Sequence, residues 1–162
     1  MANLLSNELK AVVILEDLIE TPDNILKENC LTVQKLNYDC VRKRNQKGIV
    51  YGATNPVLMT FTVRVNRNQQ ATKFFKAVLS NLTVDFSFLF NATYDSNLRL
   101  KDYDEGMVVN GYVVGVEEVY KTDPNANGQT DQMLLNVTLL VCSVTYLGSN
   151  SDSNLKGIFI YN

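Results

Sequence analysis

Carboxylates are the first residues of this chain that could do chemistry, because two Asp or Glu side chains can serve as general acid and base. Asp102, Asp104 and Glu105 follow one another closely, and Glu117 and Glu118 are adjacent. An acid/base pair requires two carboxylates that converge across a cleft. Carboxylates grouped at a turn or a strand end belong more often to a solvated surface. We therefore predict no catalytic role for either group.

The sequence also lacks the residues on which most other catalytic and cofactor sites depend. It contains no histidine, the commonest general base and neutral metal ligand. A serine or cysteine nucleophile needs a base beside it, and no such pairing is recognisable. Phosphate-binding turns place glycine between a strand and a helix, whereas Val65–Gln69 contains none. The sequence predicts a protein that is not an enzyme, with no catalytic residues, no cofactor and no metal.

The three cysteines do not form a recognisable framework. Cys30, Cys40 and Cys142 are odd in number and have no short spacing, unlike a disulfide scaffold or a zinc site. Cys40 and Cys142 lie in strand-like runs, where a free cysteine acts as a small buried hydrophobe. A Cys30–Cys40 bridge stays open and requires their two runs to be adjacent.

Charge and hydropathy restrict the partners. The 15 basic and 17 acidic residues give a formal net charge of -2, which argues against a nucleic-acid partner. No run approaches the ~18 apolar residues of a membrane span, so no membrane insertion is expected. The N-terminus has the wrong charge order and too short an apolar run for a signal peptide. We expect a cytoplasmic protein, with export by a machine that reads no cleavable signal left open.

One segment has helical periodicity. Residues 68–82 carry apolar side chains at a period near 3.6, which predicts an amphipathic helix whose stripe enters the core. The stripe consists of Ala71, Phe74, Phe75, Val78, Leu79 and Leu82. On this interpretation Phe75→Asp unfolds the protein and Lys76→Ala does not.

Nearly all the rest alternates as strands do. The predicted strands are Ala11–Leu15, Leu31–Val41 with a bulge, Val57–Val65, Thr83–Thr93, Leu98–Tyr103, Met107–Tyr120, Met133–Leu147 and Gly157–Tyr161. The fold class is therefore mainly β, a barrel or sandwich of about seven or eight mostly antiparallel strands with one α-helix at about 68–82. We expect a single domain over 1–162, with a loose N-terminal arm at 1–8 and a C-terminal extension at 148–162.

Two long strands are apolar on both faces. Met107–Tyr120 and Met133–Leu147 carry apolar residues at successive positions, so each is central or covered twice. A neighbouring subunit could supply the second cover. Gly111 and Gly115 mark a bend, a bulge or a close backbone approach.

Arg42–Pro56 is the longest polar connection in the first half of the chain. It starts with a basic run and then carries the apolar triplet at 49–51. Loops of about 15 residues are uncommon in a compact domain and often functional. The basic run fits a solvated loop or a protein interface, and the apolar triplet packs back on its own domain or docks on a partner.

The order of elements resembles the Hcp family, the tube proteins of type VI secretion. LNYDCVRKRNQKGIVYGATNPVLMTFTVRV resembles the second strand, extended loop and third strand of the family, and ATKFFKAVL resembles its helix. Its closing strands resemble LRLKDYDEGMVVNGYVVGVEEVYKTDPNANGQTDQMLLNVTLLVCSVTYL. The likeness spans Ala11–Leu147. The segment Glu16–Cys30 is longer than the usual first hairpin, and 148–162 runs past the usual end.

The resemblance implies a structural tube subunit. Copies would close into a homo-hexamer, rings would stack into a tube that carries effectors, and sheath, spike and effector proteins would be partners. The extended loop would reach the next protomer or ring, with Val50 and Tyr51 as apolar anchors and Arg42, Arg44 and Lys47 as charges that set the register. Two alternatives remain: a monomeric β-barrel that binds a ligand or peptide, and a phage-type tail-tube or baseplate protein.

Overall fold

The computed structural model describes residues 10–15, 25–39, 42–44, 46–47, 50–54, 57–65, 69–122, 131–147 and 155–159. Its elements are β1 (Ala11–Ile14), the 3-10 turn η1 (Lys27–Asn29), β2 (Leu31–Tyr38), β3 (Arg42–Arg44), β4 (Val50–Thr54), β5 (Leu58–Val65), α1 (Gln69–Leu79), β6 (Val84–Phe90), β7 (Thr93–Tyr94), β8 (Leu100–Asp102), β9 (Glu105–Thr122), β10 (Asp131–Leu147) and β11 (Leu155–Phe159). The predicted arm at 1–8 lies outside the described residues, as do residues 16–24, 123–130 and 148–154.

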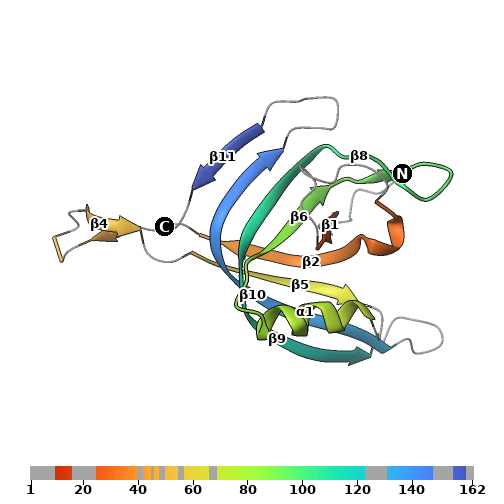
Figure 1. The fold of residues 1–162 in the computed structure, drawn as a ribbon, viewed down its shortest axis with the longest axis horizontal. Helices are drawn as coiled ribbons and strands as arrows, with labels where there is room; N and C mark the ends of the chain where they lie inside the picture. The colour runs from red at the N-terminus through yellow and green to blue at the C-terminus, as the bar shows by residue number, and fades with distance from the viewer. Residues whose placement is uncertain are drawn as a thin grey trace.

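Six strands close into an antiparallel barrel, with one helix lying across them (Figure 1). The strand order is β10-β5-β2-β1-β6-β9, and β9 pairs with β10 to complete the circle. β11 extends the sheet beyond the end of β5, because β5 pairs with residues 133–140 of β10 and β11 with residues 143–147. The predicted fold class, mainly β with one helix, is confirmed.

The predicted bulge in the second strand is present. The register between β2 and β5 shifts between Val33 and Lys35, which is where the alternation in the sequence falters. Several strand limits differ by a few residues from the sequence prediction. The return strand expected at Leu98–Tyr103 is shorter, the last strand lies at Leu155–Phe159 rather than Gly157–Tyr161, and Glu105–Gly106 already belong to β9. They pair with Phe90 and Leu89 of β6, which extends the ladder by two positions.

The β9–β10 pair is the longest ladder, and Gly111 controls its course. The register shifts once between Thr138 and Leu139 and again between Val141 and Ser143. A Cβ atom on Gly111 would lie 2.4 Å from the carbonyl oxygen of Leu140, well inside contact distance. Only glycine permits this approach of the two backbones, so the predicted role of Gly111 is confirmed.

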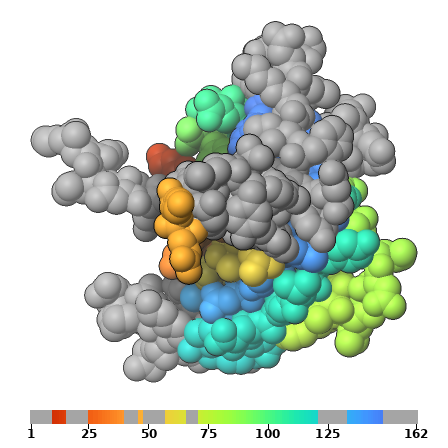
Figure 2. Space-filling model, turned by 90° about the vertical axis from the view of Figure 1, so that its left-hand side faces the viewer, coloured from red at the N-terminus to blue at the C-terminus, as the bar shows by residue number. Residues whose placement is uncertain are grey.

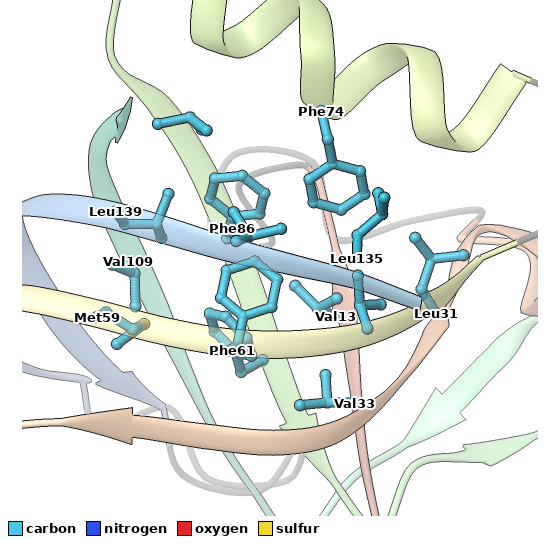
Figure 3. Close-up of a cluster of buried hydrophobic side chains, with 14 of the residues drawn as sticks. Val13, Leu31, Val33, Met59, Phe61, Phe74, Phe86, Val109, Leu135 and Leu139 are labelled. Carbon is cyan, nitrogen blue, oxygen red and sulfur yellow. The ribbon is translucent and has the colours of Figure 1, made fainter. Parts of the chain in front are cut away.

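Four phenylalanines form the centre of the barrel. Phe61 of β5 makes edge contacts with Phe86 and Phe88 of β6, with ring centroids 5.7 and 5.2 Å apart. Phe74 of α1 stacks on Phe86 at 5.9 Å, and Figure 3 shows its ring pointing from the helix into this cluster. Such pairs add roughly 0.5–1.5 kcal/mol to the burial of their area. The helix is therefore held across the barrel by one aromatic side chain with alanines beside it.

The face that α1 buries differs from the predicted stripe. Ala71, Phe74 and Ala77 are buried. Phe75 is 36% exposed and Leu79 is 85% exposed, and the helix ends at Leu79 rather than at 82. The prediction was wrong for these residues because the helix is turned so that Ala77, which lies outside the predicted stripe, faces the core in their place. The placement of Phe75 in the core is corrected accordingly.

A second, smaller cluster covers the outer face of the first half of β9. Val108 lies in it with Leu89 of β6 and Ile14 of β1, and Ile25 and Tyr103 from the adjoining segments pack over them. The second apolar face of β9 is thus covered here by the chain itself. The expectation that a neighbouring subunit covers it does not apply to this half of the strand.

Replacing Gly111 with alanine should destabilise the barrel. The added methyl group would meet the Leu140 carbonyl oxygen at 2.4 Å, and overpacking of this kind costs about 1–3 kcal/mol. Gly115→Ala is the matched control on the same strand, because its nearest neighbour would lie at 3.8 Å; we expect a change within about 0.5 kcal/mol. Urea unfolding measures both, and equal losses would contradict the proposed role of Gly111.

Neighbouring phenylalanines of α1 should differ sharply in their effect on stability. Phe74 is fully buried, so Phe74→Ala should lower the free energy of unfolding by about 3–5 kcal/mol. Phe75→Ala should cost only about 1 kcal/mol, and Phe75→Asp should leave the protein folded. Urea unfolding of the alanine variants and circular dichroism of Phe75→Asp provide the test. Equal losses for the two alanine variants would show that the helix is rotated from the position described.

Candidate functional site

The long connection between β2 and β5 forms a hairpin that projects from the barrel. β3 and β4 pair antiparallel, with Arg42 opposite Thr54 and Arg44 opposite Val50. Among the described strands they pair with each other alone. Figure 1 shows β4 extending away from the barrel. A structure this far from the core contributes little to folding and is available to contact something else.

All five residues predicted as interface residues belong to this hairpin. Arg42 and Arg44 lie on β3, Val50 and Tyr51 on β4, and Lys47 is exposed at the turn between them. The structure describes the backbone of the two strands, and their pairing brings Arg44 opposite Val50. The role of these residues in an interface remains a prediction.

The expectation of an irregular loop was wrong. A hairpin is compatible with the composition, because Val50 and Tyr51 favour strands and Lys47-Gly48 is suited to a turn. The polar residues 42–47 masked this signal. They lack the period-2 alternation of a half-buried strand, and a strand that projects from the barrel has no buried face to impose one.

A pair of tyrosines holds the root of the hairpin. The hydroxyl of Tyr38, at the end of β2, hydrogen-bonds the hydroxyl of Tyr146 on β10. Burial, together with the hydrogen bond to Tyr146, raises the pKa of Tyr38 to about 12. On the other side of the root, the N–H of Val141 donates to the carbonyl of Val57 at 2.9 Å. The point where the hairpin leaves the barrel is therefore fixed to β10 from both sides.

An apolar strip crosses the outer surface beside this root. Leu58 of β5, Leu140 of β10 and Tyr112 of β9 are cross-strand neighbours, and Val114 adjoins them on β9. Leu58 and Val114 are each 51% exposed, and Tyr112 is 39% exposed. We call these four residues the outer strip. The double-sided apolar pattern of β9 and β10 was the signal that could have located it.

The carboxylates singled out in the sequence have structural partners or lie in solvent. A side-chain oxygen of Asp104 accepts a bond of 2.9 Å from the amide of Asn91, and a side-chain oxygen of Asp102 accepts the N–H of Tyr103 at 2.8 Å. Glu117 and Glu118 are exposed on β9. None of these contacts joins two carboxylates across a cleft.

Metal and cysteine chemistry find little support in the described part of the chain. There, no group of three His, Cys, Asp or Glu side chains could hold a metal ion. Cys30 and Cys142 are free, and Cys40 lies outside the described residues. The thiol of Cys30 donates to the Leu26 carbonyl at 3.6 Å, and burial raises its pKa. A raised pKa keeps the thiol protonated and poorly reactive.

A pocket of about 520 Å³ lies on the outside of the barrel between η1 and the turn that carries Leu98. Leu26, Leu31 and Leu98 line it together with charged side chains that include Lys27 and Glu28. The barrel interior, by contrast, is filled by the phenylalanine cluster. Within the described residues, no helix is long and apolar enough to span a membrane.

Ionisation of Tyr38 should weaken the root of the hairpin at high pH. An unfolded tyrosine has a pKa near 10, whereas Tyr38 has a pKa of about 12 in the folded state. The stability that this group contributes is complete below about pH 10 and is lost as the pH rises through 12. We expect the urea midpoint of Tyr38→Phe to fall less steeply over this interval than that of the wild type.

The matched control is Tyr112→Phe, which alters a tyrosine outside the Tyr38–Tyr146 pair. It should keep the wild-type dependence on pH. Identical pH dependence in the wild type and in Tyr38→Phe would contradict the assignment.

Comparison with known proteins gives a fold but no sequence match. No family model matches the chain, and no curated protein matches it in sequence. Among solved structures, a crystal structure of an Hcp protein is 13% identical, with a TM-score of 0.61 over 92% of this chain and 98% of that protein. Hcp1 from E. coli EAEC 042 is 16% identical, with a TM-score of 0.60 over 94% and 99%. Hcp1 from Flavobacterium johnsoniae is 14% identical, with a TM-score of 0.54 over 85% and 94%.

All three are named as Hcp proteins, and none is named for an enzymatic activity. Identities this low speak for the fold alone. The resemblance predicted from the sequence is confirmed at that level: this chain has the fold of the Hcp proteins.

Proposed function

We propose that this chain is the structural subunit of a type VI secretion tube. Copies close into a ring of about six, and rings stack into a hollow tube that carries effectors. The observation that carries the proposal is the Hcp fold, matched over nearly the whole of this chain and of the solved structures. Self-association is the property that this proposal requires first.

Two features of the surface support self-association. The β3–β4 hairpin pairs with no other described strand, so its strand edges are open to a neighbour. The outer strip leaves Leu58, Tyr112 and Val114 substantially exposed next to the root. Apolar residues gathered in this way are typical of a protein interface. In the proposed tube the hairpin of one copy contacts the next copy or the next ring.

The other partners follow from the same proposal. Sheath proteins would surround the tube, spike proteins would cap it and effectors would travel with it. The subunit would be made in the cytoplasm and exported by the machine without a cleavable signal. A monomeric ligand-binding barrel is disfavoured, because the interior is occupied by Phe61, Phe74, Phe86 and Phe88.

Deleting the hairpin should abolish assembly and leave the barrel folded. Replacing residues 43–53 with a short glycine-serine linker removes most of β3 and β4, which make no ladder with the barrel. We expect the wild type to form rings of about six copies in native mass spectrometry and the deletion variant to be a folded monomer. Circular dichroism and urea unfolding confirm folding.

Point variants refine the same test. Substituting serine for Val50 and Tyr51 should weaken the rings, and substituting alanine for Arg42, Arg44 and Lys47 should alter their stacking. Unchanged rings and stacks in the deletion variant would contradict the role of the hairpin. A wild-type chain that stays monomeric at high concentration would contradict the proposed function itself.

A further inference from the structure

The outer face of α1 is apolar and basic at once. Leu79 is 85% exposed and Phe75 is 36% exposed, and they lie one helical turn apart on the side turned away from Phe74. Lys73 and Lys76 are exposed on the same helix, with Lys76 beside Leu79 on the helix surface. Nothing in the folding of the barrel requires a leucine to be this exposed.

The outer face of the strands that carry the outer strip is apolar and has a glutamate at one end. Leu135, Val137 and Leu139 of β10 are buried in the core, so the residues between them point outward. The cross-strand partners of these outward residues share their face. Asn136 pairs with Glu117 by this rule, just as Leu140 pairs with Tyr112.

Glu117 therefore lies on the same outer face as the outer strip. Glu118 pairs with the buried Leu135 and so belongs to the opposite face of β9. Glu117 supplies a negative charge at one end of the apolar outer face, whereas Lys73 and Lys76 supply a positive charge beside the apolar residues of α1. Each surface thus has the composition that would complement the other.

The two surfaces are different parts of one molecule. α1 packs against β9, and Figure 2 shows the helix at the side of the exposed face of β9. A contact between the helix of one copy and the strands of the next is therefore heterologous. Contacts of this kind repeat from copy to copy, and they generate a ring when the rotation closes.

We propose that the outer face of α1 in one copy packs on the outer strip of the next copy, with Lys73 and Lys76 facing Glu117. Phe75 and Leu79 cover Leu58, Tyr112 and Val114 in this contact. The opposite charges fix the register and reject the reversed arrangement. This inference rests on the proposed assembly into rings and specifies the faces within a ring, separately from the hairpin.

Charge reversal tests the pairing directly. The helix variant carries Lys73→Glu and Lys76→Glu, and the strand variant carries Glu117→Lys. Each variant alone places like charges across every contact, so each should be a folded monomer at concentrations where the wild type forms rings. All three changes in one chain restore opposite charges and should restore the rings.

Mixing the two variants gives a stricter test. The acidic helix of one variant fits the basic strands of the other, and the basic helix of the second fits the acidic strands of the first. An equimolar mixture should therefore form rings in which the two chains alternate. Native mass spectrometry should find even-numbered rings with a 1:1 composition.

The apolar part of the contact has its own matched control. Leu79→Gln should lower the fraction of chains in rings at least tenfold near the assembly midpoint, whereas Leu98→Gln should not change it. Leu98 is also largely exposed, at 58%, but lies on the turn between β7 and β8. Circular dichroism should show both variants folded.

The outcomes separate this inference from the proposed function. If the wild type forms rings and the helix and strand variants form them equally well, the faces assigned here are wrong and the tube proposal stands. Failure of both the mixture and the threefold variant to assemble would also overturn the pairing. If the wild type itself never assembles, the tube proposal fails and this contact fails with it.

Discussion

The length of the β9–β10 ladder is the constraint on which the rest of the structure depends. β9 has 18 residues and β10 has 17, roughly 55–60 Å of extended chain at about 3.3 Å per residue. No other strand of the barrel exceeds eight residues. The two long strands must therefore pair with shorter strands one after another along their length. Buried backbone N–H and C=O groups need hydrogen-bond partners at every position.

The outer edges of β10 and β9 find their partners in different ways. The outer edge of β10 is shared between β5 and β11. On β9, pairing with β6 stops at Gly111, and α1 packs against the strand beyond that point. The helix thus replaces a missing strand, and Phe74 fixes it there by reaching the aromatic cluster. The close approach at Gly111 is the place where the ladder changes from one partner to the other.

The sequence predicted the positions of the strands and the helix better than it predicted which of their residues are buried. The alternation in β5 and β6, the bulge near Val33 and the need for Gly111 all follow from local rules, since each depends on neighbours within one ladder. Phe75 and Leu79 could not be placed this way. Their exposure depends on which side of the helix faces the barrel, and the packing of Phe74 and Ala77 against the assembled strands decides this.

The candidate site shows the same division. The five hairpin residues were predicted as interface residues because a long polar segment with an apolar triplet is unusual. Its two strands were mistaken for a loop. The outer strip was missed as a site, because the sequence shows only that β9 and β10 are apolar on both faces. Only the fold shows which half of β9 is covered on its outer face. Ile25 and Tyr103 pack over Val108 in the first half, whereas Tyr112 in the second half is exposed.

A protein that needed only to fold would have no reason to keep both an uncovered strip and an uncovered helix face. Burying a leucine contributes about 1.5–3 kcal/mol relative to leaving it in water, and Leu79 and Leu58 forgo much of this in the isolated subunit. Their exposure has a physical purpose if another surface completes them. The outer strip and α1 both adjoin the same half of β9, so this long strand creates both surfaces. Assembly would bury apolar side chains that a single chain leaves exposed.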